Sequence, residues 1–144
     1  MIETGAPNTG TKPADGTVIE EIETRALEIG DLRIFRIRPN RDPRGWVAPT
    51  YNQAFFAGLG IRFQVAHENH CFSPRRGTVR GFHYQLPPFG QAKLIRVTKG
   101  RIYDVNVDIR EGSPTFGEAV GVELSQGDWD QISCRSGSPT AIAP

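Results

Sequence analysis

Apolar and polar residues alternate in short runs through the middle of the chain. This period of two predicts β-strands, and clusters of Pro, Gly, Asn and Asp separate the runs as turns. The predicted strands are Ile19–Ala26, Leu32–Ile37, Trp46–Tyr51, Ile61–His67, Thr78–Gln85, Ala92–Thr98, Arg101–Ile109 and Ala119–Leu124. One short helix fits residues Tyr51–Leu59. Many short strands at this spacing are typical of an all-β sandwich or a barrel-like jelly roll.

Both ends of the chain lack this pattern. Residues 1–17 contain Gly, Pro, Asn and Thr with almost no apolar content, which predicts a disordered tail. The strand pattern ends at Ile132, and residues 133–144 have no period and little apolar surface to bury. We therefore expect one foldable domain over residues 18–132, followed by an aberrant tail over residues 133–144.

The chain length, net charge and cysteine count exclude several classes of protein. The 144 residues suit a single domain, and a net charge of +1 lacks the broad positive field of a nucleic-acid binder. Cys71 and Cys134 are too few for a disulfide framework, and their spacing is not that of metal ligands. No stretch approaches a membrane span and no signal-peptide pattern is present, so we expect a reducing cytoplasm.

Two of the predicted strands bring a candidate catalytic pair together. If the turn between them is centred on Pro88, antiparallel pairing sets His83 opposite Lys93 and Gln85 opposite Gln91. An imidazole that titrates near neutrality would then lie beside an ammonium that can stabilise developing negative charge. This register predicts a base and a cation on one face of a hairpin.

Three further polar positions on strands need separate interpretations. Strict alternation places Arg80 on the opposite face from His83, so a bulge or a site at the mouth of the sheet must reconcile them. Asp104 and Asp108 alternate along one strand, and we expect them to serve structure rather than acid–base chemistry.

Several motifs in one continuous order carry a family resemblance. They are Asp42-Pro-Arg44-Gly, Arg80-Gly-Phe-His83-Tyr-Gln, Gln91-Ala-Lys93-Leu, Tyr103-Asp-Val-Asn-Val-Asp108-Ile-Arg110 and Ser113-Pro-Thr-Phe-Gly117. Over about Leu32 to Gln131 the chain resembles the dTDP-4-dehydrorhamnose 3,5-epimerase family. The resemblance implies a cupin-type jelly roll (a double-stranded β-helix), incomplete at its C-terminus here, in a homodimer that uses no metal or organic cofactor.

The resemblance also implies a reaction and its residues. The family epimerises C3 and C5 of dTDP-4-dehydro-6-deoxy-D-glucose, giving dTDP-4-dehydro-L-rhamnose for dTDP-rhamnose biosynthesis. A carbon acid beside a ketone needs a base and a cation on the oxygen; by position, His83 matches the base and Lys93 the enolate stabiliser. The matching substrate-binding positions are Arg44, His67, Asn69 and Arg80. Arg44 is expected to reach the neighbouring subunit's site.

The chain departs from the family pattern in several places: His67 stands where the family commonly has Gln, and the turn Pro74 to Gly77 is one residue longer than usual. Pro49 stands where members often carry a substrate-contacting Glu. The chain also ends before the family's Phe-Ala-His-Gly motif, its tyrosine acid and the carboxylate that orients the base, so we expect little or no turnover. Permitted codons for Ser133 to Ala143, read two bases out of frame, can spell that motif. The hypothesis is a frame-shifted ending, which the DNA sequence tests.

Two other classes of function remain open. One is a non-catalytic protein that binds the dTDP moiety through Arg44, Asn69 and Arg80. The other is a metal-dependent cupin with a metal at His67, His70 or His83, although the usual cupin His-x-His pair is absent and no metal is expected. Deuterium exchange at C3 or C5 of the sugar separates an enzyme from a binding protein.

Overall fold

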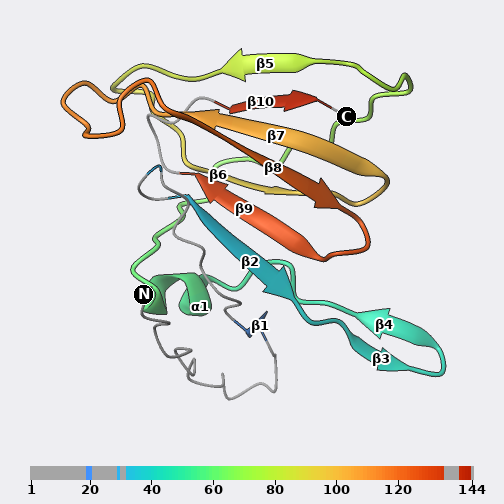
Figure 1. Cartoon of the computed structure of the whole chain (residues 1–144). Helices are drawn as coiled ribbons and strands as arrows, with labels where there is room; N and C mark the ends of the chain where they lie inside the picture. Colours follow the sequence, from blue (N-terminus) through green and yellow to red (C-terminus); the bar gives the residue numbers. More distant parts are fainter. Residues whose placement is uncertain (1–18, 21–28, 30–31, 135–139, 144) are drawn as a thin grey trace, which may run out of the picture.

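Two antiparallel sheets make up the body of the molecule. The computed structural model describes residues 19–20, 29, 32–134 and 140–143. The first sheet has the order β1-β2-β9-β6 and the second the order β5-β10-β7-β8 (Figure 1). The first comprises β1 (Ile19–Glu20), β2 (Arg33–Ile37), β9 (Asp130–Cys134) and β6 (Lys93–Arg96). The second comprises β5 (Arg80–His83), β10 (Thr140–Ala143), β7 (Arg101–Val107) and β8 (Ala119–Ser125).

The hydrophobic core lies between these two sheets. Ile132 and Cys134 of β9 are buried against Leu124 of β8, so side chains of both sheets meet in one cluster. Partly buried apolar residues complete the cluster: Ile34, Ile95, Val97, Ile102, Val120 and Val122. The predicted all-β sandwich is confirmed, and the inner face of each strand is the face that these residues occupy.

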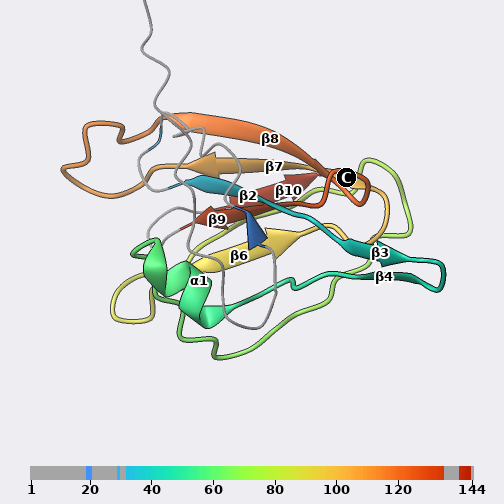
Figure 2. The same cartoon turned by 90° about the horizontal axis from the view of Figure 1, so that it is seen from below.

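Helix α1 (Gln53–Gly58) covers the outer face of the first sheet. It begins after Asn52, whose side-chain oxygen accepts a hydrogen bond of 2.9 Å from the amide of Phe55. Phe56 of the helix is buried and packs edge-to-face on Phe35 of β2, with ring centroids 5.0 Å apart. Figure 2 shows α1 and β6 on the side of the molecule away from β7 and β8. The helix predicted within Tyr51–Leu59 is confirmed.

The hairpin predicted around Pro88 is wrong. β5 pairs with β10 in the second sheet, whereas β6 pairs with β9 in the first. Turn residues dictate only a local change of direction, and the connection here crosses from one sheet to the other. Pairing with β9 sets Ile95 directly against Ile132 in the core, and burial of that pair favours the long-range register.

The end of strand pairing was also predicted incorrectly. β9 continues beyond Ile132 to Cys134, and Thr140–Ala143 form β10 between β5 and β7 (Figure 1). β10 therefore completes the second sheet, because without it β5 has no neighbouring strand there. The expectation overlooked this short apolar run, which has too few residues to show a period.

Other predicted elements match in part. Ile61–His67 form no strand, and a short hairpin of β3 (Asn40–Asp42) and β4 (Gly45–Val47) replaces the single predicted strand Trp46–Tyr51. The predicted disordered tail, residues 1–17, lies outside the described residues. In the part of the chain that the structure describes, no helix has the length and apolar character needed to cross a membrane.

Candidate functional site

Lys93 projects from the first sheet toward the interior of the sandwich. It alternates on β6 with Ile95, which packs into the core, so both side chains belong to the inner face. The Lys93 ammonium is half-buried and donates a hydrogen bond of 2.9 Å to the backbone carbonyl of His83. This bond joins the first sheet to β5 of the second sheet.

His83 belongs to the inner face of the second sheet. The strand registers align His83 with Thr140, then Asn106, then Val120, across β5, β10, β7 and β8. Directly aligned residues share a face, and Val120 packs into the core. His83 and Lys93 therefore approach each other from opposite sheets. Their predicted proximity is present even though the predicted hairpin is not.

A register shift in β5 brings Arg80 onto the face of His83. The two residues are three positions apart, whereas the β10 residues aligned with them are only two apart. One extra residue in β5 restores a common face, as a bulge does, and this is one of the two arrangements that the sequence required. The Arg80 guanidinium donates to the Phe72 carbonyl at 3.2 Å and to the Ser73 hydroxyl at 3.1 Å.

Two buried polar residues on β7 face the same interior. Asp104 and Asn106 are fully buried, and the Asn106 amide donates to one Asp104 oxygen at 2.9 Å. The other Asp104 oxygen and the Asn106 oxygen have no hydrogen-bond partner within the described chain. Burial raises the pKa of Asp104 to about 6, while the hydrogen bond from Asn106 and the charge of Lys93 act in the opposite direction.

From the sequence, Asp104 was expected to serve structure, and Asn106 was given no role. The signal that identifies both is visible in the alternation of β7. Ile102 marks the inward positions of this strand, and the next two inward positions are polar. Polar residues at core positions of a strand need a partner or a function.

Cys134 of β9 lies directly beside Lys93 in the register of the first sheet. Its thiol is buried and donates weakly to the Lys93 carbonyl at 3.7 Å. Burial, reinforced by the charge of Asp104, raises the pKa of this thiol to about 12. The thiol therefore stays protonated near neutral pH, so it is a poor nucleophile here and packs as a small apolar side chain.

Arg80 and His83 are exposed in the single chain, and so are the remaining predicted site residues. The side chain of Arg44 is 90% exposed and bonds to Asp42 at the turn between β3 and β4. Figure 1 shows that hairpin projecting away from the two sheets, so Arg44 lies away from the inner face. His67 and Asn69 are exposed in the segment between α1 and β5, which has no regular secondary structure. Glu68, which stands between them in the chain, lies 3.9 Å from Arg96, so this part of the segment runs beside β6.

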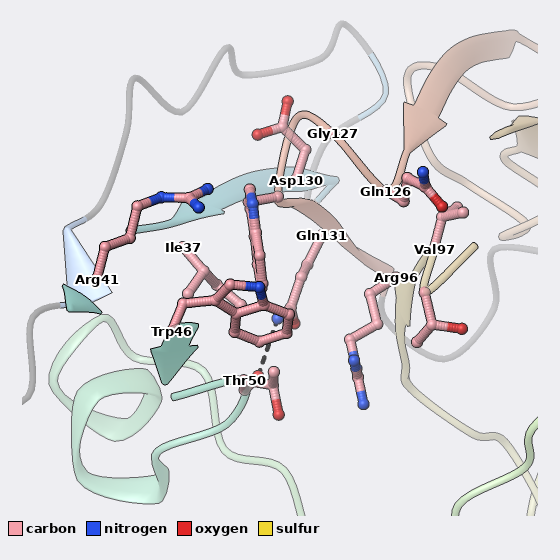
Figure 3. Close-up of a pocket in the computed structure, with 12 residues that line it drawn as sticks. Ile37, Arg41, Trp46, Thr50, Arg96, Val97, Gln126, Gly127, Asp130 and Gln131 are labelled. Carbon is pink, nitrogen blue, oxygen red and sulfur yellow. Dashed lines mark hydrogen bonds between the residues drawn. The ribbon is translucent and has the colours of Figure 1, made fainter. Parts of the chain in front are cut away.

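A separate cavity of about 460 Å³ opens on the other side of the first sheet (Figure 3). Arg96 points into it, and alternation along β6 sets Arg96 on the face opposite Lys93. The rings of Trp46 and Trp129 meet edge-to-face there, with centroids 4.5 Å apart. None of the residues predicted for the site lines this cavity; its lining is Ile37, Arg41, Trp46, Thr50, Arg96, Val97, Thr98, Gln126, Gly127, Trp129, Asp130 and Gln131.

The metal-dependent alternative finds no ligand set in the described ranges. No three His, Cys, Asp or Glu side chains gather there as a metal ion requires. His70 instead lies 3.3 Å from the hydroxyl of Thr98.

Comparison with known proteins gives a consistent family. A family model described as dTDP-4-dehydrorhamnose 3,5-epimerase matches residues 26–139, which extends past Ile132. A dTDP-4-dehydrorhamnose 3,5-epimerase from Sinorhizobium fredii is 38% identical over 122 residues, covering 85% of this chain and 63% of that protein. The chain thus spans between about half and two thirds of the length of such curated relatives.

Solved structures agree in fold. The dTDP-4-dehydrorhamnose 3,5-epimerase of Bacillus anthracis, with TDP and PPi bound, superposes with a TM-score of 0.81 at 34% identity, over 88% of this chain and 70% of that one. An epimerase of Legionella pneumophila in complex with dTDP-4-keto-L-rhamnose gives a TM-score of 0.74 at 36% identity, over 81% and 61%. The predicted jelly roll is confirmed by this similarity.

Proposed function

Because the chain belongs to the dTDP-4-dehydrorhamnose 3,5-epimerase family, we propose that it epimerises C3 and C5 of dTDP-4-dehydro-6-deoxy-D-glucose. The product is dTDP-4-dehydro-L-rhamnose, an intermediate of dTDP-rhamnose biosynthesis. The observation that carries the proposal is the approach of Lys93 to His83 from opposing sheets, with 2.9 Å between the ammonium and the His83 carbonyl.

The chemistry of the reaction accounts for this pair. The protons at C3 and C5 are acidic because each carbon adjoins the C4 ketone, and removing one produces an enolate. The His83 imidazole is the base, since a neutral imidazole accepts a proton near neutral pH. The Lys93 ammonium donates to the enolate oxygen and stabilises its charge. Reprotonation from the opposite side of the ring inverts the carbon.

Deuterium exchange tests the proposal without requiring a complete turnover. The substrate is incubated with the protein in heavy water, and NMR measures deuterium at C3 and C5. We expect exchange in the unmodified chain and a loss of at least about 100-fold in His83→Asn and Lys93→Met. Arg96→Met is the matched control, because it removes a cation from the same strand but from its other face.

Each outcome of this experiment has a distinct meaning. Exchange without epimerised product means that base and enolate stabiliser work while the proton donor is missing. Binding of the dTDP-sugar without any exchange overturns the enzymatic proposal in favour of a non-catalytic binding protein. Equal losses in Lys93→Met and Arg96→Met would remove the special role of Lys93.

Substrate binding is assigned to Arg44, His67, Asn69 and Arg80. The relatives with TDP and with dTDP-4-keto-L-rhamnose bound support a dTDP-sugar ligand. The planar guanidinium groups of Arg44 and Arg80 suit a diphosphate, because their paired donors match its oxygens. Alanine at either position should raise the dissociation constant for dTDP in calorimetry, whereas the control Arg96→Ala should not.

We also propose a homodimer in which the β3–β4 hairpin serves the neighbouring subunit. The hairpin exposes Trp46 by 55% and Val47 by 76%, which is unusual for residues of this kind. Further large apolar side chains are exposed on residues 65–89: Val65, Phe72, Val79, Phe82, Tyr84, Leu86 and Phe89. Mixing Arg44→Ala with His83→Asn tests the arrangement, since exchange should return only if one subunit completes the other's site.

The proposed location is the cytoplasm. Cys71 and Cys134 are both free, and unpaired thiols fit a reducing compartment. Cell fractionation with an antibody to the chain is the direct measurement.

A further inference from the structure

Packing alone does not explain why the polar residues Asp104 and Asn106 occupy buried positions. Both side chains are fully buried at inward positions of β7, next to an apolar cluster that includes Ile102 and Val122. Only one hydrogen bond joins them, and one oxygen of each lacks a partner in the described chain. A buried acceptor without a donor costs free energy, and an apolar residue would avoid that cost. Their presence therefore calls for a role.

Lys93 and Asp104 belong to the inner faces of the two opposing sheets. The charge of Lys93 favours the ionised form of Asp104. A lysine ammonium has three N–H donors, so it can donate to the His83 carbonyl and to a carboxylate at the same time. The side chain of Asn106 holds the carboxylate from its other side at 2.9 Å.

We propose that Asp104 is a positioning residue that anchors the Lys93 ammonium beside His83, with Asn106 fixing the orientation of the carboxylate. The inference rests on the function proposed above and names a residue which that function did not include. Asp104 touches no substrate in this account. Its carboxylate restrains a long flexible side chain that has to meet the enolate oxygen in one place.

Few other charged groups can influence Asp104. Lys93 faces it from β6 and the protonated thiol of Cys134 from β9. The residue aligned with Asp104 on β8 is the uncharged Val122. Across β10, Ile142 aligns Asp104 with Arg80 of β5, and His83 belongs to the same strand, so both of these groups lie two strands away. Because Asp104 has a pKa of about 6, the anchor is complete above that pH and is lost as the carboxylate protonates below it.

Nitrogen NMR of the lysine side chains tests the anchor directly. The chain has only three lysines, Lys12, Lys93 and Lys99, so nitrogen-15 labelling at Nζ gives few signals. In the unmodified protein we expect the Lys93 Nζ shift to change in a step with a midpoint near pH 6. The step should persist in His83→Asn, which removes the imidazole of the residue that accepts the Lys93 hydrogen bond.

Two matched substitutions complete this test. Asp104→Asn should abolish the Lys93 step, because the amide keeps the shape of the carboxyl but cannot ionise. Asp130→Asn is the control, since it removes a carboxylate that pairs instead with Arg36 on another strand. Equal behaviour of Lys93 in the two variants overturns the proposal. If Asp104→Asn does not fold, the other two proteins still decide the question. The proposal is overturned if the Lys93 step is missing in the unmodified protein or in His83→Asn.

The exchange reaction separates this inference from the proposed function. Above pH 7 we expect Asp104→Asn to slow deuterium exchange about 10-fold, with dTDP-sugar binding unchanged, because only the placement of the cation is lost. The fall in exchange rate below about pH 6 should become shallower in this variant. A Lys93 step without exchange in the unmodified protein supports the anchor and overturns the function. Exchange without a Lys93 step overturns the anchor alone.

Discussion

Two carboxylates on one stretch of chain are equally buried but differ in the number of hydrogen bonds that they accept. Asp104 in the middle of β7 and Asp108 just after it are both completely inaccessible to solvent. Asp108 accepts hydrogen bonds from the Arg110 guanidinium at 2.7 and 2.9 Å, from the Ser113 hydroxyl at 2.6 Å and from the Thr115 hydroxyl at 2.8 Å. From the described residues, Asp104 accepts one hydrogen bond, donated by Asn106.

The number of donors decides the sign of the pKa shift. The Arg110 guanidinium, with further hydrogen bonds from Ser113 and Thr115, holds the pKa of Asp108 well below its usual range despite burial. For Asp104, burial dominates and raises the pKa to about 6. Burial alone therefore says little about a carboxylate. A buried carboxylate with several donors stabilises the loop that supplies them. A buried carboxylate with few donors costs free energy, and such a cost points to a function.

The two groups must change stability in opposite directions with pH. Asp108 has a lowered pKa, so its contribution is present above the ordinary carboxyl pKa near 4 and is lost as the pH falls. Asp104 has a raised pKa, so the folded state binds the proton more tightly. The loss of stability caused by ionising buried Asp104 is absent below about pH 4 and complete above about pH 6.

The largest expected effect is at Asp108. Replacing it with Ala should lower the free energy of unfolding by about 3–5 kcal/mol near pH 7, because Arg110 and two hydroxyls lose a buried partner. Urea denaturation followed by fluorescence measures the change. Asp128→Ala is the control, because Asp128 is an exposed carboxylate with one hydroxyl partner. A loss no greater than that of the control would contradict the structural role.

Asp104 should respond with the opposite sign. Asp104→Asn should raise the free energy of unfolding by up to about 3 kcal/mol near pH 8 and change it little near pH 4, since a shift from 3.8 to about 6 is roughly two units. The same urea experiment at the two pH values measures this. Destabilisation at both would mean that the carboxylate is a structural partner like Asp108.

The donors of Asp108 should contribute separately. Ser113→Ala should lower the free energy of unfolding by about 2 kcal/mol near pH 7, because it removes a hydrogen bond to a charged acceptor. The difference should shrink as the pH falls and the carboxylate protonates. A double-mutant cycle with Thr115→Val measures how strongly the two hydroxyls depend on each other.

The smallest effect is expected at Asn106. Asn106→Ala should lower the free energy of unfolding by about 1 kcal/mol near pH 8, because ionised Asp104 loses its donor. The pKa of Asp104 should then rise further, and the midpoint of the Lys93 Nζ titration should move upward with it. An unchanged midpoint would mean that Asn106 does not support the carboxylate.

Much of the local structure was predictable from the sequence. Five of the predicted strands contain strands of the structure, and the helix begins directly after Asn52, the residue that caps it. The need for a bulge between Arg80 and His83 follows from counting positions, and the register shift is there. These features depend on neighbours in the chain, so the sequence contains them directly.

The sequence by itself determined which residues alternate, where turns interrupt them and that His83 and Lys93 carry the chemistry of a base and a cation. Only the tertiary structure decided that β5 and β6 belong to different sheets and that Asp104 and Lys93 belong to the inner faces of the two sheets. A period of two assigns a residue to a face but does not choose the neighbouring strand. That choice depends on burying apolar faces contributed by distant segments, such as Ile95 against Ile132.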